Sequence, residues 1–312
     1  MSLSINTNTS AMVALETLNA TQTQLSATEN AVSTGKKVAN ASDSPAAFGI
    51  ASQMNGNISG QGAVNDGLSF ASSVVSSTNS AANQILSVLA EVQAAVTTIG
   101  NNQGSSTSLD QINTEINGYL QQIDTIAQNA TTNGVNLLVS SSSSGTLGIT
   151  AASLTYVTGL QGSTATISNL FSAAKVGTPT ATNTLSEMLG LAASDSSGLA
   201  STNNFLASGG SITMGSATSF NLTKAITAVQ NAITAMTNVT STLGQNTKNI
   251  ANMSTFGLSV ADNLTSGVGS LTDADMSAES AKLTSLQTKQ SLAIKSLSIA
   301  NGQSQNILSL FQ

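Results

Sequence analysis

The chain has 312 residues, of which only 7% are charged, and its net charge is −6. It contains no His, Cys, Trp or Arg, which excludes a His-based catalytic triad, a thiol nucleophile, a disulfide and the usual structural zinc sites. Eight Lys are too few for the basic surface that phosphate binding requires. We therefore predict neither an enzyme nor a nucleic-acid-binding protein.

The few patterns that resemble catalytic or cofactor sites have simpler explanations. Asp273 and Asp275 are paired carboxylates, but acidic residues of this kind commonly stand near the start of a helix. Gly60 and Gly62 are followed by Asn65 where a dinucleotide-binding fingerprint needs its third Gly, and no strand pattern precedes them. We expect no catalytic residue, no metal and no cofactor.

Membrane and export signals are also missing from the sequence. No apolar run approaches the roughly 18 residues of a membrane span. The N-terminus lacks the charged-then-apolar order of a cleaved signal peptide. We expect no membrane segment, and we expect any export to use another route.

Residues 1–40 predict a helix with a narrow apolar seam. The polar residues 6–10 supply caps, and Gly35, followed by Lys36 and Lys37, ends the helix. A seam this narrow needs a partner helix, because a helix of an ordinary bundle has a wider apolar face. The seam residues recur at steps of three and four, as in a coiled coil: Ala11, Leu15, Leu18, Gln22, Leu25, Glu29 and Val32.

Residues 40–67 read as a connector. Ser44 before Pro45 predicts an N-cap and the first residue of a short helix that reaches about Met54. Four glycines follow and predict a break in helical structure: Gly56, Gly60, Gly62 and Gly67.

Residues 68–100 and 109–130 predict two helices joined by the polar turn 101–108, and a loop this short makes them antiparallel neighbours. Asn133 and Gly134 end the second helix. The residues that we expect in the core of this bundle include Val88, Val92, Ile116 and Ile123.

Residues 140–221 change in character. Leu154–Val157 and residues 165–167 predict short strands, and residues 185–191 alone keep a helical period. A low-complexity linker is the alternative, but we favour a folded insert because enough apolar residues are present for a minor core: Phe171, Phe205, Leu206, Ile212 and Phe220.

Residues 224–271 carry the strongest periodicity in the chain and predict one long helix. At Thr272 the phase of the repeat slips by one residue, which predicts a joint before the last segment. The heptad positions that we assign to the inner bundle are Val229, Met236, Leu243, Ile250 and Leu264.

Residues 273–312 predict a last helix with a second narrow seam and few charges. The simplest partner for this seam is the first helix, so we predict that the two ends of the chain pair. The seam contains Leu283, Leu286, Gln290, Ala293, Leu297, Ala300, Ser304, Ile307 and Phe311.

The predicted fold is mainly α, with a long antiparallel coiled coil and helical bundle formed by both chain ends and a small β-rich central insert. We predict three domains. Residues 1–40 and 272–312 form a terminal coiled coil, residues 41–138 and 223–271 form the bundle, and residues 139–222 form the exposed insert.

This order of elements, together with five short motifs, resembles bacterial flagellin over about residues 1–138 and 223–312. The motifs are Ser-Ile-Asn-Thr-Asn at 4–8, Ser-Thr-Gly-Lys-Lys-Val at 33–38, Asn-Asp-Gly-Leu-Ser at 65–69, Asn-Gly-Val-Asn-Leu-Leu at 133–138 and Asn-Ile-Leu-Ser-Leu at 306–310. Family members sensed by innate immune receptors carry arginines before a Glu in the first bundle helix; here Val88 and Ala90 precede Glu91.

The resemblance implies a structural subunit that polymerises with itself into the flagellar filament outside the cell, for swimming motility. It also implies hook-associated junction and cap proteins and a flagellar export chaperone as partners, and unfolded export through the flagellar channel. The terminal seams would line the inner tube and be buried only after assembly, with both ends disordered in the free monomer. We also hypothesise O-linked glycans on the Ser- and Thr-rich insert.

The sequence leaves three alternatives to a filament-forming flagellin. A hook-filament junction protein shares the terminal seams, but the intact motifs around Asn133 and Leu310 favour a flagellin. Flagellins with a metallopeptidase in the insert need His residues, which this chain lacks. A coiled-coil surface adhesin would keep one heptad frame without a returning chain.

Overall fold

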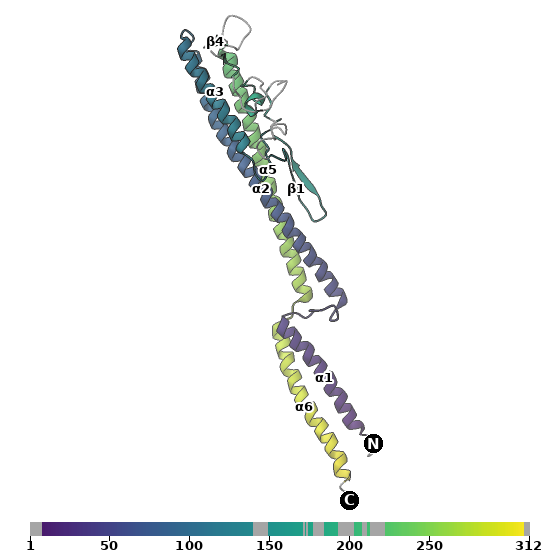
Figure 1. Cartoon of the computed structure of the whole chain (residues 1–312). Coiled ribbons are helices and arrows are strands. Elements are labelled where there is room, and N and C mark those ends of the chain that lie inside the picture. Colours follow the sequence, from purple (N-terminus) through teal and green to yellow (C-terminus); the bar gives the residue numbers. More distant parts are fainter. Residues whose placement is uncertain are drawn as a thin grey trace. The chain divides into compact units, whose positions relative to one another are not determined.

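The computed structural model describes residues 8–139, 149–170, 172, 174–176, 184–192, 203–207, 211–212 and 222–308. Long helices dominate this part of the chain, and two short β-hairpins accompany them, as Figure 1 shows. The mainly α fold with a small β-rich insert is therefore confirmed. The chain divides into two compact units, residues 1–59 with 260–312 and residues 60–259.

The first and last helices, α1 (Thr9–Thr34) and α6 (Met276–Leu308), pack against each other. Asn8 caps α1 by accepting a hydrogen bond from the backbone N–H of Ala11, and Gly35 ends it in the left-handed conformation with φ of 70°. That conformation costs Gly nothing, so the predicted helix end is confirmed. Asp275 caps α6 by accepting hydrogen bonds from the backbone of Ser277 and Ala278.

Hydrogen bonds along the helix pair give its direction. Asn8 Nδ2 donates to the carbonyl of Ala300 at 2.8 Å, and Gln290 Nε2 donates to Gln22 Oε1 at 3.2 Å. Residue numbers that rise along α1 therefore meet numbers that fall along α6, so the two helices are antiparallel. The predicted pairing of the chain ends is confirmed.

The two chain segments that leave this helix pair are joined to each other. The backbone N–H of Lys37 donates to Thr272 O at 2.8 Å, and that of Ala274 donates to Gly35 O at 2.9 Å. Lys37 Nζ also donates to Ser270 O, in the last turn of the helix that ends at Thr272. A cation is favourable at the C-terminal end of a helix. The predicted joint at Thr272 is present, and it is cross-linked by backbone hydrogen bonds.

The second helix, α2 (Pro45–Ile99), is longer than the sequence predicted. Ser44 caps it as expected, with Oγ accepting from the backbone of Ala47 at 3.4 Å. The predicted break at the glycines is wrong, because the helix runs through all four. Apolar residues at helical spacing on the same segment are buried and outweigh the helix propensity of Gly, which is weaker than that of Ala by about 1 kcal/mol per residue: Ala51, Val64 and Leu68.

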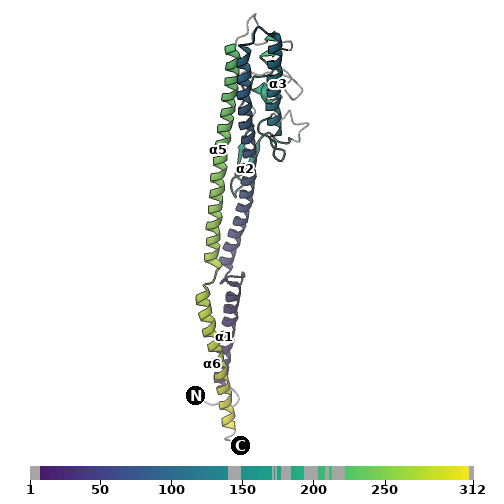
Figure 2. The ribbon, with the colours of Figure 1, turned by 90° about the vertical axis from the view of Figure 1, so that its left-hand side faces the viewer.

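Helices α3 (Ser106–Asn129) and α5 (Leu222–Thr272) complete the bundle with α2. Figures 1 and 2 show α3 folding back alongside α2. Gly257 of α5 lies against the side-chain ends of Gln61 and Asn65 of α2. Asn133 and Gly134 both have positive φ and form a turn after α3, but they do not end the helix as predicted, because α3 already ends at Asn129 with Ala130 as its C-cap.

The described part of the insert contains two antiparallel hairpins and one short helix. The two predicted strands are present as β1 (Leu154–Val157) and β2 (Thr164–Ile167), which pair with each other, and β3 (Leu206–Ala207) pairs with β4 (Ser211–Ile212). The helix α4 (Leu185–Met188) is shorter than predicted.

The insert has no separate minor core among the described residues, contrary to our prediction. Leu154, Leu185 and Phe205 belong to the same buried cluster as the residues of α2, α3 and α5. Phe171 and Phe220, and the side chain of Ile212, lie outside the described residues. The insert shares the bundle core because its short elements have too little apolar surface to bury among themselves.

Buried polar side chains fix the insert on α3. Asp124 of α3 accepts hydrogen bonds from the backbone and the hydroxyl of Ser186, at 2.8 and 2.7 Å. Asn203 donates to the side-chain oxygens of Asn113 and Asn117, each at 2.7 Å. Because buried polar groups require partners, these contacts determine where the insert sits on the helix.

Ser and Thr hydroxyls on the exposed helix faces bond back to their own helices. Thr17 donates to Val13 O, Thr234 to Gln230 O and Thr288 to Thr284 O, each at 2.9 Å. Each hydroxyl therefore has its hydrogen-bond acceptor within its own helix, at the carbonyl one turn earlier. No helix in the described part of the chain is long and apolar enough to pass through a bilayer.

Candidate functional site

The terminal helix pair, α1 with α6, is the candidate functional site because its seam is thin and its outer faces are apolar. Leu25 is 7% exposed and Leu286 is 3% exposed, so the seam is already closed at its centre in a single chain. We had expected burial of these residues only after assembly. Small residues complete the contact: Thr21, Thr28, Ala293 and Ala300 are buried, and Leu18, Val32, Leu283 and Leu297 are half-buried.

Three positions of the predicted α1 seam are not buried against α6. Leu15 is 48% exposed and Glu29 is also exposed. Gln22 is exposed as well, although its side chain still accepts a hydrogen bond from Gln290 of α6. The seam uses Thr21 and Thr28 instead, each one residue earlier than predicted. The predicted positions were wrong because a pattern of apolar residues includes Leu15 and leaves out Thr. The heptad steps from Leu18 through Leu25 to Val32 give the correct register of the seam.

The seam of the helix pair is partly polar. The Thr28 side chain is 1% exposed and its hydroxyl has no hydrogen-bond partner. Thr21 is also buried, but its hydroxyl donates to Thr17 O at 2.8 Å. A hydroxyl that is buried without a partner destabilises the pair, so α1 and α6 are held together weakly for their length.

Large apolar side chains lie outside the seam and face solvent. Because successive helical residues are about 100° apart, Val13 and Leu15 point to opposite sides of α1, and so do Leu292 and Ile294 on α6. The helix pair therefore has an apolar surface on both of its sides. The residues and their exposed fractions are Met12 at 66%, Val13 at 63%, Leu292 at 60%, Ile294 at 53% and Ile299 at 72%.

These outward residues were missed by the sequence analysis, which searched only for one seam per helix. The sequence does indicate them, because they are large apolar residues at helix positions that do not belong to the seam. In a monomeric protein such positions are normally polar, so their apolar character indicates a second contact.

One side of the helix pair is hollowed into a groove of about 360 Å³. Val13 and Leu292 border it, and Lys289 is the charged residue among the side chains that line it. The outer side of α1 forms a second hollow, where Met12, Leu15 and Glu16 lie together. The groove is therefore lined by a positive charge, at Lys289, and the second hollow by a negative one, at Glu16.

The predicted inner-bundle residues are brought together, with one exception. Eight of them belong to a single buried cluster: Val88, Val92, Ile116, Ile123, Val229, Met236, Leu243 and Ile250. Leu264 is only half-buried, and it lies in the part of α5 that belongs to the other compact unit. Phe311 and the side chain of Ile307 lie outside the described residues.

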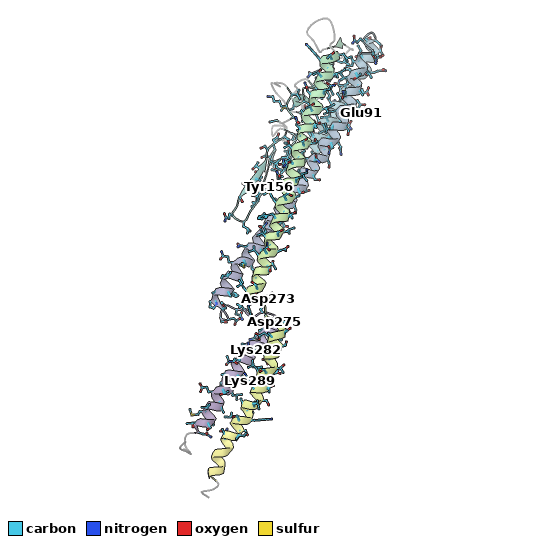
Figure 3. The ribbon with its side chains drawn as sticks, turned by 180° about the vertical axis from the view of Figure 1, so that it is seen from behind. Glu91, Tyr156, Asp273, Asp275, Lys282 and Lys289 are labelled. Atoms are coloured by element: carbon cyan, nitrogen blue, oxygen red, sulfur yellow. The ribbon has the colours of Figure 1, made fainter. Side chains whose placement is uncertain are left out.

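The described residues contain no group of His, Cys, Asp or Glu side chains able to hold a metal ion. Both tyrosines have shifted pKa values. A hydrogen bond from Tyr119 Oη to Glu115 Oε1 at 3.1 Å raises the pKa of Tyr119, and burial raises the pKa of Tyr156 on β1 (Figure 3). Neither tyrosine lies in the terminal helix pair.

Two family models match the chain at the places where these helices lie. Residues 5–143 match the bacterial flagellin N-terminal helical region, and residues 226–311 match the C-terminal helical region. The chain belongs to the bacterial flagellins. As a flagellin it is a structural subunit that polymerises with itself into the flagellar filament, outside the cell, and it is not an enzyme.

Similar flagellins align with this one over nearly its whole length. Flagellin FljK of Caulobacter vibrioides is 30% identical and flagellin C of Rhizobium meliloti is 33% identical, and each alignment covers 99% of this chain and at least 98% of the relative. A flagellin of Brucella melitensis is 30% identical with the same coverage of this chain. The predicted membership is confirmed, and the junction protein and the adhesin are not favoured.

Proposed function

We propose that the α1–α6 helix pair is the surface through which subunits pack in the filament, and that the bundle holds each subunit together. In this division, residues 1–40 with 272–312 form the inner tube, residues 41–138 with 223–271 form the next layer, and residues 139–222 face solvent. The observation that carries the proposal is the apolar surface on both sides of the helix pair.

A helical polymer needs two different surfaces on each subunit, because every copy contacts one neighbour ahead and another behind. The opposite placement of Val13 and Leu15, and of Leu292 and Ile294, supports this requirement. A single apolar face would favour a closed dimer. The low charge of the chain also supports the proposal, since few charged groups need to lose water on assembly.

The seam residues take a different part in assembly from the outward residues. Leu18, Leu25, Val32, Leu283, Leu286 and Leu297 hold α1 against α6, which presents the outward side chains in fixed positions. Leu15 belongs with the outward residues because it is exposed in the single chain. We assign Ile307 and Phe311 to the terminal seam on the periodicity of the sequence alone.

Further partners follow from the same assignment. The first and last subunits of the polymer have one uncovered surface each, which suits the hook-associated junction and cap proteins. Before assembly the apolar sides of the helix pair need protection, which suits an export chaperone, and secretion would use the flagellar channel. The Ser- and Thr-rich insert is the proposed place for O-linked glycans.

Substitution of an outward residue tests the division of labour. Leu292→Asp should abolish filament formation, measured by sedimentation and electron microscopy, while the melting temperature of the soluble subunit stays unchanged. Leu243→Asp, in the buried bundle core, should lower that melting temperature strongly, because a buried apolar side chain is lost and an unpaired charge is buried.

Val157→Asp is the matched control, since Val157 is also exposed but lies on the insert. It should change neither assembly nor melting. If Leu292→Asp assembles as well as Val157→Asp does, the helix pair is not the packing surface.

A further inference from the structure

The charges of the terminal helix pair are sorted by helix. Within Thr9–Thr34, α1 has two carboxylates and no Lys, whereas Met276–Leu308 of α6 has three Lys and one carboxylate. They are Glu16 and Glu29 on α1, and Glu279, Lys282, Lys289 and Lys295 on α6. One helix is therefore acidic and the other is basic.

These charges do not neutralise each other across the helix pair. Lys282 pairs with Glu279 of its own helix at 3.4 Å. Glu16 and Lys289 are exposed, and neither has an ion-pair partner among the described residues. Lys282 and Lys289 are labelled along the pair in Figure 3. An acid and a base that remain unpaired in the subunit are available to another molecule.

The two charges stand on two different surfaces of the helix pair. Lys289 lines the groove between α1 and α6, beside Leu292. Glu16 lies on the outer face of α1 with Met12 and Asn19 and lines the hollow there. Both surfaces combine apolar side chains with a charged one, and the two charges are opposite.

We propose that the groove of one subunit receives the outer face of α1 from a neighbouring subunit, and that Lys289 pairs with Glu16 across this contact. This inference rests on the proposed function of the helix pair and names the residues that orient the contact. The occupant of the groove is a second copy of this chain, because the chain itself carries an apolar surface whose charge is opposite to that of the groove.

The charges also decide between a closed dimer and a polymer. Two grooves placed face to face would bring Lys289 against Lys289, and two outer faces would bring Glu16 against Glu16. Like charges in a contact suppress that arrangement, whereas a groove against an outer face joins opposite charges. A contact between two different surfaces does not close on itself, so it continues from subunit to subunit.

Charge reversal in the full chain tests the pairing. Glu16→Lys and Lys289→Glu should each raise the critical concentration for assembly about tenfold at low ionic strength, because an attractive exposed pair becomes a repulsive one. The double variant, with both reversals, should return to within about threefold of the original protein. In about 0.5 M salt, where charges are screened beyond about 4 Å, the single variants should approach the original protein.

Lys175→Glu on the insert is the matched control, since it is exposed and changes the net charge by the same amount as Lys289→Glu. It should leave the critical concentration unchanged. Circular dichroism should show that all variants fold alike, because every substituted side chain is exposed. Seeded sedimentation of each variant gives its critical concentration.

Two results would overturn the inference in distinguishable ways. If the unsubstituted chain assembles, but Glu16→Lys and Lys289→Glu assemble like Lys175→Glu, the pairing is wrong and the packing surface stands. A double variant as defective as the single ones would equally exclude the pair. If outward apolar substitutions such as Leu292→Asp also leave assembly intact, the proposed function of the helix pair fails as well.

Discussion

Gly257 of α5 and Gln61 of α2 lie so close together that a side chain at position 257 would overlap the amide of Gln61. Gln61 is 6% exposed, and its amide donates to the side-chain oxygen of the half-buried Asn65 one turn later on the same helix, at 3.5 Å. The glycine thus leaves room between the two helices for this pair of side chains.

The first prediction follows from this contact. Gly257→Ala should destabilise the bundle by about 1 to 3 kcal/mol, because the added methyl group overpacks the gap. Gly244→Ala is the matched control on the same helix, since no atom lies within 4 Å of its Cβ position. That control should stabilise the chain by up to about 1 kcal/mol through helix propensity. Urea denaturation of both variants gives their free energies of unfolding. Equal changes in the two variants would contradict the close contact at Gly257.

The second prediction concerns the unpartnered hydroxyl in the seam. Thr28→Val should stabilise the α1–α6 pair by about 1 kcal/mol, because a methyl group replaces a buried hydroxyl of similar shape that has no hydrogen-bond partner. Thr21→Val should gain less, since the Thr21 hydroxyl already donates to Thr17 O. The rate of hydrogen exchange of the α1 backbone measures the stability of the helix pair in both variants. Faster exchange in Thr28→Val would mean that its hydroxyl has a partner after all.

The third prediction concerns the attachment of the insert. Asn203→Asp keeps an oxygen for the backbone N–H groups of Phe205 and Leu206, but it removes the amide that donates to Asn113 and Asn117. A carboxylate would then face two amide oxygens, so the insert should detach with a cost of about 2 kcal/mol or more.

Limited proteolysis within the insert should accelerate in Asn203→Asp. Asn204→Asp changes a neighbouring side chain that donates to Gly190 O and Ala192 O of the insert, and it serves as the comparison. Equal rates of cleavage for the two variants would show that the contact with α3 is not the determining one.

The fourth prediction is the response to alkaline pH. Because the folded-state pKa of Tyr156 is raised above its ordinary value of 10.0, the folded chain keeps a proton that the unfolded chain loses. The stability should therefore be constant with respect to this group below pH 10 and should fall as the pH rises from 10 toward the raised pKa. Tyr156→Phe should remove this slope, measured by denaturation at several alkaline pH values.

Tyr119 provides an internal comparison for that experiment. Its pKa is raised mainly by the hydrogen bond to the Glu115 carboxylate, so Glu115→Gln should lower the pKa seen by absorbance titration. The chain has only two tyrosines, so the two transitions can be assigned by substitution. A titration of Tyr119 that is unchanged in Glu115→Gln would contradict this assignment.

Helical periodicity was sufficient to predict most of the fold. The heptads from Val229 to Ile250 gave a buried helix face, and the seam of α6 from Leu283 to Ala300 was correct at every described position. The local stop signal at Gly35 was also reliable, because its positive φ ends α1 at little cost to a glycine.

The errors arose where tertiary contacts outweigh local preference. The glycines of α2 did not break the helix, because the bundle core stabilises its other face. In α1, the seam runs through Thr21 and Thr28, and a pattern of apolar residues alone cannot distinguish a buried Thr from an exposed one. The placement of the insert depends on Asp124 and Asn203, whose partners are 62 and more residues away in sequence.

The hydroxyls that bond back to their own helices affect how the exposed faces interact with water. Thr17, Thr234 and Thr288 each satisfy a carbonyl of the preceding turn, so they depend less on solvent for their hydrogen bonds. A face of charged side chains would have to be dehydrated before a neighbour could cover it. This neutral face releases its bound water easily, so polar surface and close packing between identical subunits are compatible.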